Sequence, residues 1–411
     1  MRLNLPVAID GHPFRKEVAL LFQAALLIFI FTVVVGILNG TDAVDFGQKT
    51  ILTHVHTGTL GWLTLSVFAT SLWLFGQGEL TPGERTSARF LSYAAVVSFL
   101  AYNGAFLTTA GTLRPTLGGF ALATIAGFLV WIAVRARSVE ITTPHVGILA
   151  AVGTSVVGGV LGVLLGIKIA TGDNVLPEGG EDAHPATMVI GFLIPVGMAL
   201  AEWALAWPKP ALVNRLGVMQ MVLPFIGGGF VATGLLLDAP PLIGLSLPFE
   251  LAGVGIFLRR MWPLFKKVDW RAASPSRFAT VAAAAIAVDL AIFVYLVARY
   301  EGDFDNAPTH QVLALDHVMF IGVMTNAILA LLFSLLAGRT SWLASVQHVV
   351  FLGMNAGLAG FAMGLFFDVS VLKQVSTPVL GGAILVAIVA VSLSLLRSPA
   401  TQPQPAVGPA A

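Results

Sequence analysis

Apolar segments long enough to span a membrane recur along the entire chain, and this feature decides the fold class. We count twelve, at roughly 17–39, 52–76, 88–110, 115–135, 144–170, 184–207, 216–237, 241–262, 278–299, 312–337, 341–367 and 377–396. About twenty apolar residues in a helix cross the hydrocarbon core of a bilayer. Since 57% of the 411 residues are hydrophobic and only 10% are charged, the sequence predicts an all-α polytopic membrane protein with twelve transmembrane helices.

The distribution of Lys and Arg predicts the orientation of these spans. If both termini are cytoplasmic, 17 of the 22 Lys and Arg residues fall on the inner side, as the positive-inside rule requires. We therefore expect a multi-pass protein of a bacterial-type inner (plasma) membrane with cytoplasmic N- and C-termini. Residues 1–397 are predicted to form a single transmembrane domain, and residues 398–411 a disordered tail rich in Pro and Ala.

Composition also excludes several classes of function. The formal net charge is +1, so the chain as a whole has no basic field that would attract nucleic acid. The absence of Cys excludes disulfides, thiolate metal sites, Fe–S clusters and cysteine nucleophiles. His, Met and carboxylates are the ligands that remain for a metal or a haem.

A short pattern repeats once in each third of the chain, near the start of the second, sixth and tenth spans. Its glycines are Gly61, Gly191 and Gly322, separated by 130 and 131 residues. This spacing predicts three four-helix units around a pseudo-threefold axis. A glycine at this place suits either close helix packing or the face of a macrocycle, and the pattern does not separate the two.

Histidines precede each of these glycines: His54 and His56, His184, and His317. All three spans run from outside to inside, so the four imidazoles are expected at a similar, outer depth. His54 and His56 differ by roughly 200° around a helix, and should face opposite neighbours. A lone histidine at a helix end is often only interfacial, but ionisable groups inside a membrane usually serve a function. Four such residues in a repeat therefore suit bis-histidine haem b, or a copper or zinc site.

Twelve spans in three quartets, with His-x-His-x-x-x-x-Gly-Trp opening the second and His opening the sixth and tenth, resemble the haem-copper oxidase subunit I superfamily. The pattern is most similar to the NnrS-type haem- and copper-containing membrane proteins. The resemblance implies that His54 or His56 holds a low-spin haem together with His317. It also implies an oxidoreductase of the haem-copper type and a role in handling nitric oxide, a small gaseous ligand.

The sequence departs from the oxidases where oxygen is reduced. The tenth span has one His and the seventh has none, and the sixth lacks His-x-x-x-Tyr. A complete oxygen-reducing centre is therefore not expected. We predict a haem-b-binding protein, with copper or another transition metal as a further candidate at His54, His56, His184 and His317, that acts in electron transfer or in nitric oxide resistance.

Three other residues within the spans are candidates. His348, near the inner end of the eleventh span, is too deep to join the outer cluster; it is a ligand for a second cofactor or a partner of a backbone carbonyl. Glu250 and Asp289 fall near mid-membrane with no cation assigned to them, and are expected to be protonated or to share a proton. They define either a proton path or a structural hydrogen bond.

Two further hypotheses concern partners and class. The acidic outer loop at 178–182 precedes His184 and is a candidate docking site for a periplasmic electron donor, although such loops are usually only solvated. The main alternative function is a proton-coupled secondary transporter that uses Glu250 and Asp289. Transporters usually show inverted or paired six-span repeats, so the threefold glycine spacing favours the haem protein. A cofactor-free structural or assembly subunit is the third alternative.

Overall fold

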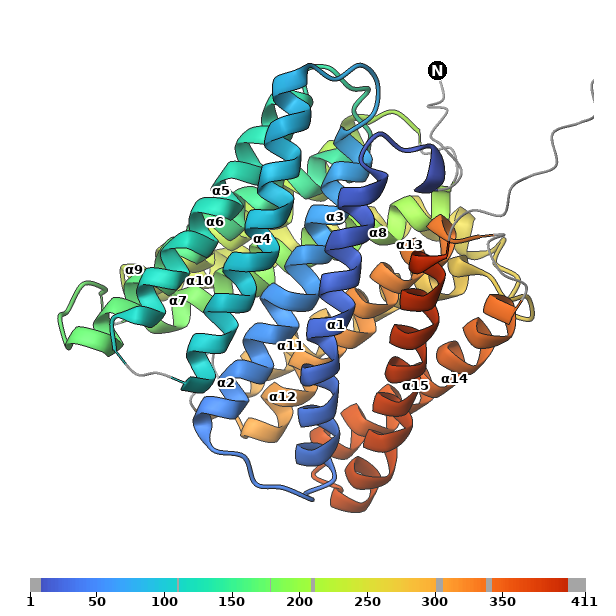
Figure 1. Ribbon diagram of the computed structural model, residues 1–411. Helices are drawn as coiled ribbons and strands as arrows, with labels where there is room; N and C mark the ends of the chain where they lie inside the picture. Colours follow the sequence, from blue (N-terminus) through green and yellow to red (C-terminus); the bar gives the residue numbers. More distant parts are fainter. Residues whose placement is uncertain are drawn as a thin grey trace, which may run out of the picture.

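The computed structural model describes residues 9–108, 111–177, 179–207, 211–300, 306–337 and 342–397, and these residues form a bundle of long helices (Figure 1). Twelve of the helical segments are long and apolar enough to cross a membrane. No strand is present in these ranges. The predicted all-α polytopic membrane fold is therefore confirmed, and the predicted tail at 398–411 lies outside the described residues.

Nine of the twelve spans are single helices. They are α1 (Arg15–Gly40), α4 (Pro82–Thr108), α5 (Leu113–Arg135), α6 (Thr143–Thr171), α9 (Arg215–Leu236), α10 (Pro240–Phe265), α11 (Pro275–Arg299), α14 (Trp342–Phe366) and α15 (Ser370–Leu396). A short 3-10 helix, η1 (Ile9–Gly11), precedes α1.

The second, sixth and tenth spans are each interrupted by a π-helix. They consist of α2 (Gln48–His56), η2 (Thr57–Thr64) and α3 (Leu65–Phe75); of α7 (Gly180–Thr187), η3 (Met188–Leu193) and α8 (Ile194–Ala206); and of α12 (Thr309–His317), η5 (Val318–Thr325) and α13 (Asn326–Leu335). These are the three spans that carry the repeated pattern.

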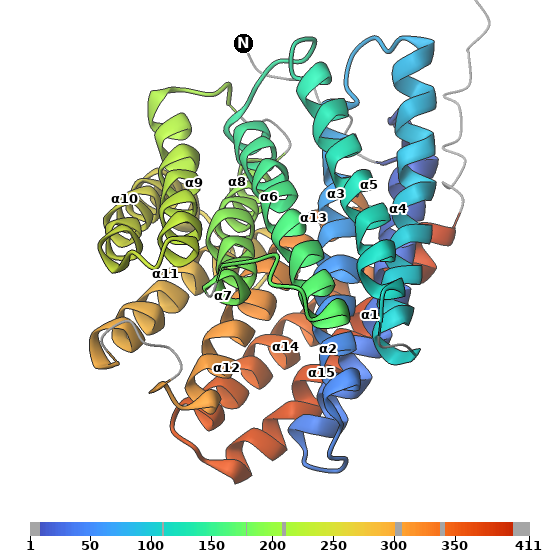
Figure 2. The same ribbon diagram turned by 90° about the vertical axis from the view of Figure 1, so that its left-hand side faces the viewer.

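The same three spans form the centre of the bundle. In their most apolar stretches 83, 83 and 89% of the residues are buried, against at most 56% in any of the other nine spans. The outer helices surround them: α15 packs against both α14 and α1, so that the last quartet joins the first (Figure 2). This arrangement fits the predicted three four-helix units, and the structure adds that the second span of each unit lies at the centre.

The repeated glycines mark where each central span touches the first helix of its own quartet. A Cβ atom on Gly61 would overlap Ile28 of α1, and one on Gly191 would lie 2.5 Å from Cγ2 of Thr154 on α6. At Gly322 it would lie 3.1 Å from Cβ of Ala285 on α11. Of the two interpretations that the sequence allowed, the structure supports close helix packing.

Local chemistry explains the π-helices. The hydroxyl oxygens of Thr64 and Thr325, which occupy equivalent positions, donate to carbonyls five residues earlier, at Thr59 and Phe320. These bonds satisfy carbonyls in the widened turn. In the sixth span the equivalent position is followed by Pro195, which has no N–H to continue the regular helical pattern.

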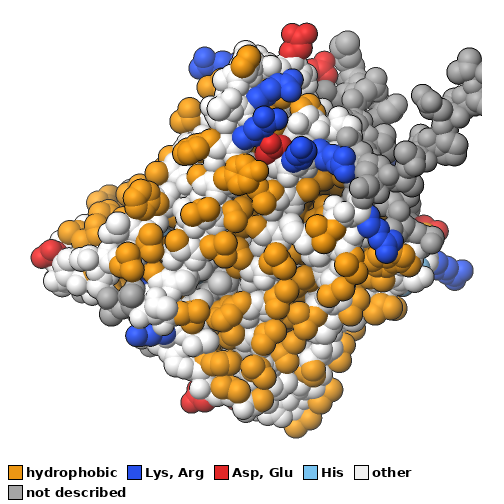
Figure 3. All heavy atoms as spheres, in the orientation of Figure 1, with side chains coloured by type: hydrophobic (Ala, Val, Ile, Leu, Met, Phe, Trp, Pro, Cys, Tyr) orange, Lys and Arg blue, Asp and Glu red, His pale blue; other side chains and the backbone are white. Residues whose placement is uncertain are grey.

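Charged side chains are concentrated at one end of the bundle. Figure 3 shows Lys and Arg gathered at the upper end of the face drawn and hydrophobic side chains over the broad region below. We call the end with Arg15, Arg135 and Arg260 the basic end, and the opposite end, where α2, α7 and α12 begin, the histidine end. A bilayer around the apolar region accounts for this distribution.

Candidate functional site

Four histidines lie at the histidine end, each within the turn that precedes a π-helix. His54 and His56 are in the last turn of α2, His184 in the last turn of α7 and His317 in the last turn of α12. All four side chains are half-buried. The prediction that the three central spans bring imidazoles to one end of the bundle is confirmed.

The first pair joins the second and tenth spans. His54 and His317 lie close enough that a positive charge on one ring would repel a charge on the other. His54 faces Gly36 of α1, where an added Cβ would lie 3.3 Å from the imidazole Cε1. His317 meets Phe361 of α14 edge to face, with ring centroids 4.9 Å apart. Gly36 and Phe361 are therefore apolar neighbours of this pair.

The second pair joins the second and sixth spans. His56 lies within electrostatic range of His184 and of Arg114. Its ring stacks on Phe106 of α4 with centroids 4.0 Å apart. His184 packs against α6 at Gly162, where a Cβ would lie 2.8 Å from the imidazole Cε1. The two histidines of α2 therefore face different neighbours, as their separation of roughly 200° predicts.

Hydrogen bonds determine the tautomer of three of the four rings. The Nδ1 atoms of His56, His317 and His184 lie 2.8, 2.7 and 2.8 Å from the carbonyl oxygens of Leu52, Leu313 and Gly158. A carbonyl only accepts, so Nδ1 carries the proton and donates it. The Nε2 lone pair is then free to bind a metal, which is the usual arrangement of a ligating histidine.

His54 differs from the other three because its Nδ1 is buried without a hydrogen-bond partner, although the ring lies within range of the Thr32 backbone. A buried polar atom without a partner costs free energy. Such an atom is expected where a ligand or a reorientation of the ring completes the site.

The four imidazoles form two pairs and not one centre. Within the described residues no group of three or more His, Cys, Asp or Glu side chains is arranged to hold a metal ion. Each pair brings together two imidazoles from different helices, and of the two histidines on α2 it is His54 that lies within electrostatic range of His317.

His348 lies far from both pairs. It is in the first turns of α14. The other end of α14 reaches the histidine end, where the Leu365 carbonyl accepts a hydrogen bond from His310 at the start of α12. His348 is about 25 Å along the helix from Leu365. Nη1 of Arg277 donates to Nδ1 of His348 at 3.2 Å. The expectation that His348 cannot join the outer cluster is therefore confirmed, whereas its role as a ligand of a second cofactor stays a prediction.

Glu250 and Asp289 are both buried, with exposed fractions of 1 and 5%. Asp289 is within electrostatic range of Glu250 and of Asp316. The two carboxyl groups do not share a hydrogen bond: Oε1 of Glu250 and Oδ1 of Asp289 have no partner. Of the two expected states, a proton shared in a direct hydrogen bond is not seen, and protonation of each separate acid stays a prediction.

Asp316 directly precedes His317 and does not cap a helix. The helix α12 begins seven residues earlier, at Thr309, after Pro308. The polar first turns of the tenth span are helical because the helix extends beyond its apolar segment. Asp316 therefore lies inside the helix and beside the buried acids.

Two polar residues near the basic end, Glu202 and His145, are buried. Glu202 accepts two hydrogen bonds from Arg260, at 2.7 and 2.8 Å, and one from Gln220. His145 accepts at Nδ1 from Thr142 and lies with Nε2 3.1 Å from the carbonyl of Leu74. Both side chains are fully partnered within the protein, so neither is a candidate for cofactor binding.

Sequence reasoning missed the residues that surround the histidines. Gly36, Gly162, Phe106 and Phe361 lie on α1, α6, α4 and α14, far from the histidines in sequence. The glycine-rich stretch at 153–166 is the sequence signal for one of them. Gly158 in this stretch packs on Met188, whereas Gly162 leaves room for an imidazole.

The acidic loop is only partly described. Glu181 pairs with Lys168 at 3.0 Å, and both side chains are accessible to solvent; residue 178 lies outside the described residues.

Comparison with known proteins finds no protein-family model and no curated protein that matches this sequence.

Proposed function

We propose that this membrane protein binds haem b between His54 and His317, and that His56 and His184 hold a second haem or a transition metal such as copper. The observation that carries the proposal is the pairing of imidazoles across the central spans, with Nδ1 bonded to a carbonyl in three of the four. Gly36 and Gly162 support it, because a side chain at either position would crowd an imidazole.

The residues present fit such a group. Phe361 and Phe106 offer apolar ring faces beside the two pairs. Burial in a bundle with few polar groups favours a neutral imidazole, the form that ligates iron or copper. A haem bound here would supply reversible one-electron chemistry and an iron that can take a gaseous ligand.

From this chemistry we infer a role in electron transfer or nitric oxide handling, as an oxidoreductase of the haem-copper type without a complete oxygen-reducing centre. With the predicted orientation, both histidine pairs lie near the periplasmic face of a bacterial-type inner membrane. A periplasmic electron donor would then approach the loop that holds Lys168 and Glu181. The resemblance of the repeated motif to the NnrS-type proteins supports this proposal.

A visible spectrum of the detergent-purified protein, oxidised and dithionite-reduced, tests the proposal. After expression with ample haem we expect a Soret band and the spectrum of bis-histidine haem b. His54→Ala and His317→Ala should remove the same spectral component, whereas His310→Ala is a matched control that should leave it unchanged. Absence of the Soret band, or an unchanged spectrum in the His317→Ala protein, would refute the proposal.

The second pair requires its own readout. Metal analysis together with the haem content per chain distinguishes a second haem from copper. His56→Ala and His184→Ala should each lose the same haem or metal, and both should keep the component that depends on His54. If each of these replacements lost a different component, the pairing of His56 with His184 would be wrong.

The second candidate function is a proton-coupled secondary transporter, and the buried acids favour it. Glu250 and Asp289 each have a carboxyl oxygen without a partner in the bundle interior. Carboxylic acids in this situation can carry protons, in a transporter or toward a haem. Loss of a proton-coupled flux in Asp289→Asn or Glu250→Gln, with no haem in the purified protein, would favour the transporter.

A further inference from the structure

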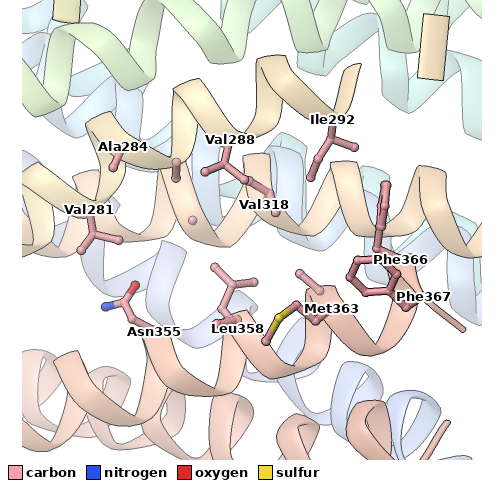
Figure 4. A pocket seen from close by; sticks show the side chains of 14 residues that line it. Val281, Ala284, Val288, Ile292, Val318, Asn355, Leu358, Met363, Phe366 and Phe367 are labelled. Carbon is pink, nitrogen blue, oxygen red and sulfur yellow. The ribbon is translucent and has the colours of Figure 1, made fainter. Parts of the chain in front are cut away.

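An apolar groove runs along the bundle between α11 and α14, with η5 as its floor. Its volume is about 440 Å³, and Figure 4 shows the side chains that line it. Among the lining residues are Val281, Val288, Ile292, Leu358, Met363 and Phe366. The groove opens toward the membrane, because Val288 and Met363 at its edges are 51 and 48% exposed.

Arg277 lies one helical turn before Val281, beyond the end of the groove that is nearer the basic end. It lies on the same face of α11 as Val281 and Val288, because Val281 follows Arg277 by four residues and Val288 follows Val281 by seven. Its guanidinium reaches α14, where Nη1 donates to Nδ1 of His348 and the cation lies 4.6 Å from the centre of the Phe351 ring. One buried cation therefore bridges the two helices that form the walls of the groove.

The guanidinium of Arg277 has unused donors. The residue is 2% exposed, and both Nε and Nη2 are buried without hydrogen-bond partners. Only the carbonyl of Trp270 and the His348 ring are bonded, both through Nη1. Arg favours planar anions that accept two parallel hydrogen bonds, so this unsatisfied fork suits a phosphate.

The surrounding segment adds positive charge. The connection between α10 and α11 holds Lys266, Lys267 and Arg271, and its one carboxylate, Asp269, is within electrostatic range of Arg277. The carboxylate also accepts from the backbone N–H of Arg271 at 2.9 Å. Trp270 is half-exposed, as indole rings at a membrane interface usually are. The net field at this end of the groove attracts an anion at the level of the lipid headgroups.

We propose that an anionic phospholipid binds here, with its phosphate at Arg277 and one acyl chain in the groove between α11 and α14. The segment from Val281 to Ile292 gives the chain about 16 Å of apolar wall. A free anion would not fill the groove, and an uncharged apolar molecule would leave the guanidinium unsatisfied. A molecule that carries an anion on a long hydrocarbon chain satisfies both.

Native mass spectrometry of the full chain in detergent, titrated with single lipids, tests the headgroup. We expect phosphatidylglycerol to bind about tenfold more tightly than phosphatidylcholine, and Arg277→Gln to abolish this preference. Arg271→Gln, an exposed arginine of the same connection, is the matched control and should retain most of it. Equal binding of the two lipids by the unaltered protein, or an undiminished preference in Arg277→Gln, would overturn the proposal.

A second variant tests the groove without touching the charge. Ala359→Phe places a ring among the lining residues from an exposed position on α14, and should lower retention of both lipids at least tenfold while the protein remains monodisperse. Unchanged phosphatidylglycerol binding by this variant would exclude the groove as the acyl site. If inorganic phosphate alone displaced the lipid completely at millimolar concentration, the site would bind free anions and the proposal would fail.

Discussion

At the residue scale, hydrogen bonds distinguish structural histidines from histidines that keep a ring nitrogen unbonded. His12 and His145 have both ring nitrogens engaged by the protein, so each is a structural residue. The four histidines beside the π-helices leave a nitrogen unbonded. Sequence position alone does not make this distinction, because it depends on carbonyls and hydroxyls of other helices.

Protonation of His12 should lower the stability of the folded protein in acid. It lies before α1, and burial lowers its pKa from 6.5 to about 4, although a bond to the Trp73 carbonyl partly opposes the shift. The folded protein therefore favours the neutral ring. The contribution of the neutral His12 ring to the free energy of unfolding amounts to about 3 kcal/mol. It is complete above pH 6.5 and is lost as the pH falls toward 4.

Thermal unfolding of the detergent-purified protein at pH 7.5 and pH 4.5 measures this effect. His12→Gln keeps a donor for the Trp73 carbonyl but does not titrate, so its unfolding temperature should fall less between the two pH values. Identical pH dependence in the two proteins would show that protonation of His12 does not destabilise the fold.

The ion pair between Glu202 and Arg260 predicts a large cost when only one partner is removed. Their side chains are 8 and 16% exposed, and Gln220 bonds to the same carboxylate. Glu202→Gln would leave the guanidinium poorly compensated, and we expect a loss of about 3 kcal/mol in the free energy of unfolding.

The double variant Glu202→Gln, Arg260→Met removes both charges and should recover part of that loss in the same unfolding assay. If the double variant lost more free energy of unfolding than the two single variants lose together, the cost could not be assigned to an unpaired charge.

At the element scale, the three central spans combine a π-helix with a glycine that approaches a neighbouring helix. Trp62 of η2 donates to the hydroxyl oxygen of Thr325 in η5 at 3.1 Å and so links two of the widened turns directly. The π-helices change the direction in which later side chains point. This is why the close contacts of the central spans do not follow a simple 3.6-residue period.

Alanine replacements of the repeated glycines should differ in cost. At Gly191 the new Cβ would lie 2.5 Å from Cγ2 and 3.1 Å from Oγ1 of Thr154, whose side chain is itself buried. At Gly322 the contacts are side chains at 3.1 and 3.2 Å. We expect Gly191→Ala to lose about 2 kcal/mol more than Gly322→Ala in the free energy of unfolding.

Gly229→Ala is the control for that series, because no atom lies within 4 Å of its added Cβ. Its unfolding temperature should equal or exceed that of the unaltered protein, since alanine favours the helix. Equal effects at Gly191 and Gly322 would show that the closer contact with Thr154 is relieved as easily as the looser contacts at Gly322.

At the scale of the whole molecule, the predicted orientation can be tested cleanly because the chain has no Cys. Arg137 and Asp173 are exposed at opposite ends of the bundle. In intact cells a membrane-impermeant maleimide should label Asp173→Cys and leave Arg137→Cys unlabelled until the cells are lysed. The reverse pattern would place the histidine pairs on the cytoplasmic side.

Much of the arrangement of the whole molecule could be predicted from the sequence. Twelve spans follow from apolar length alone, since a bilayer requires each segment to satisfy its own backbone. The glycine spacing then indicated three equivalent units. Span limits were less accurate: the last span begins at Ser370 and not near 377, because polar residues continue the helix beyond the apolar core.

The sequence by itself determined the fold class, the repeat and the end of the bundle to which four histidines belong, because these depend on hydrophobic length and local period. Only the tertiary structure decided that His54 lies near His317 while His56 lies near His184, that Glu202 meets Arg260, and that Glu250 and Asp289 do not bond. Each of these depends on the rotation and approach of separate helices. Packing sets those quantities, and no local pattern encodes them.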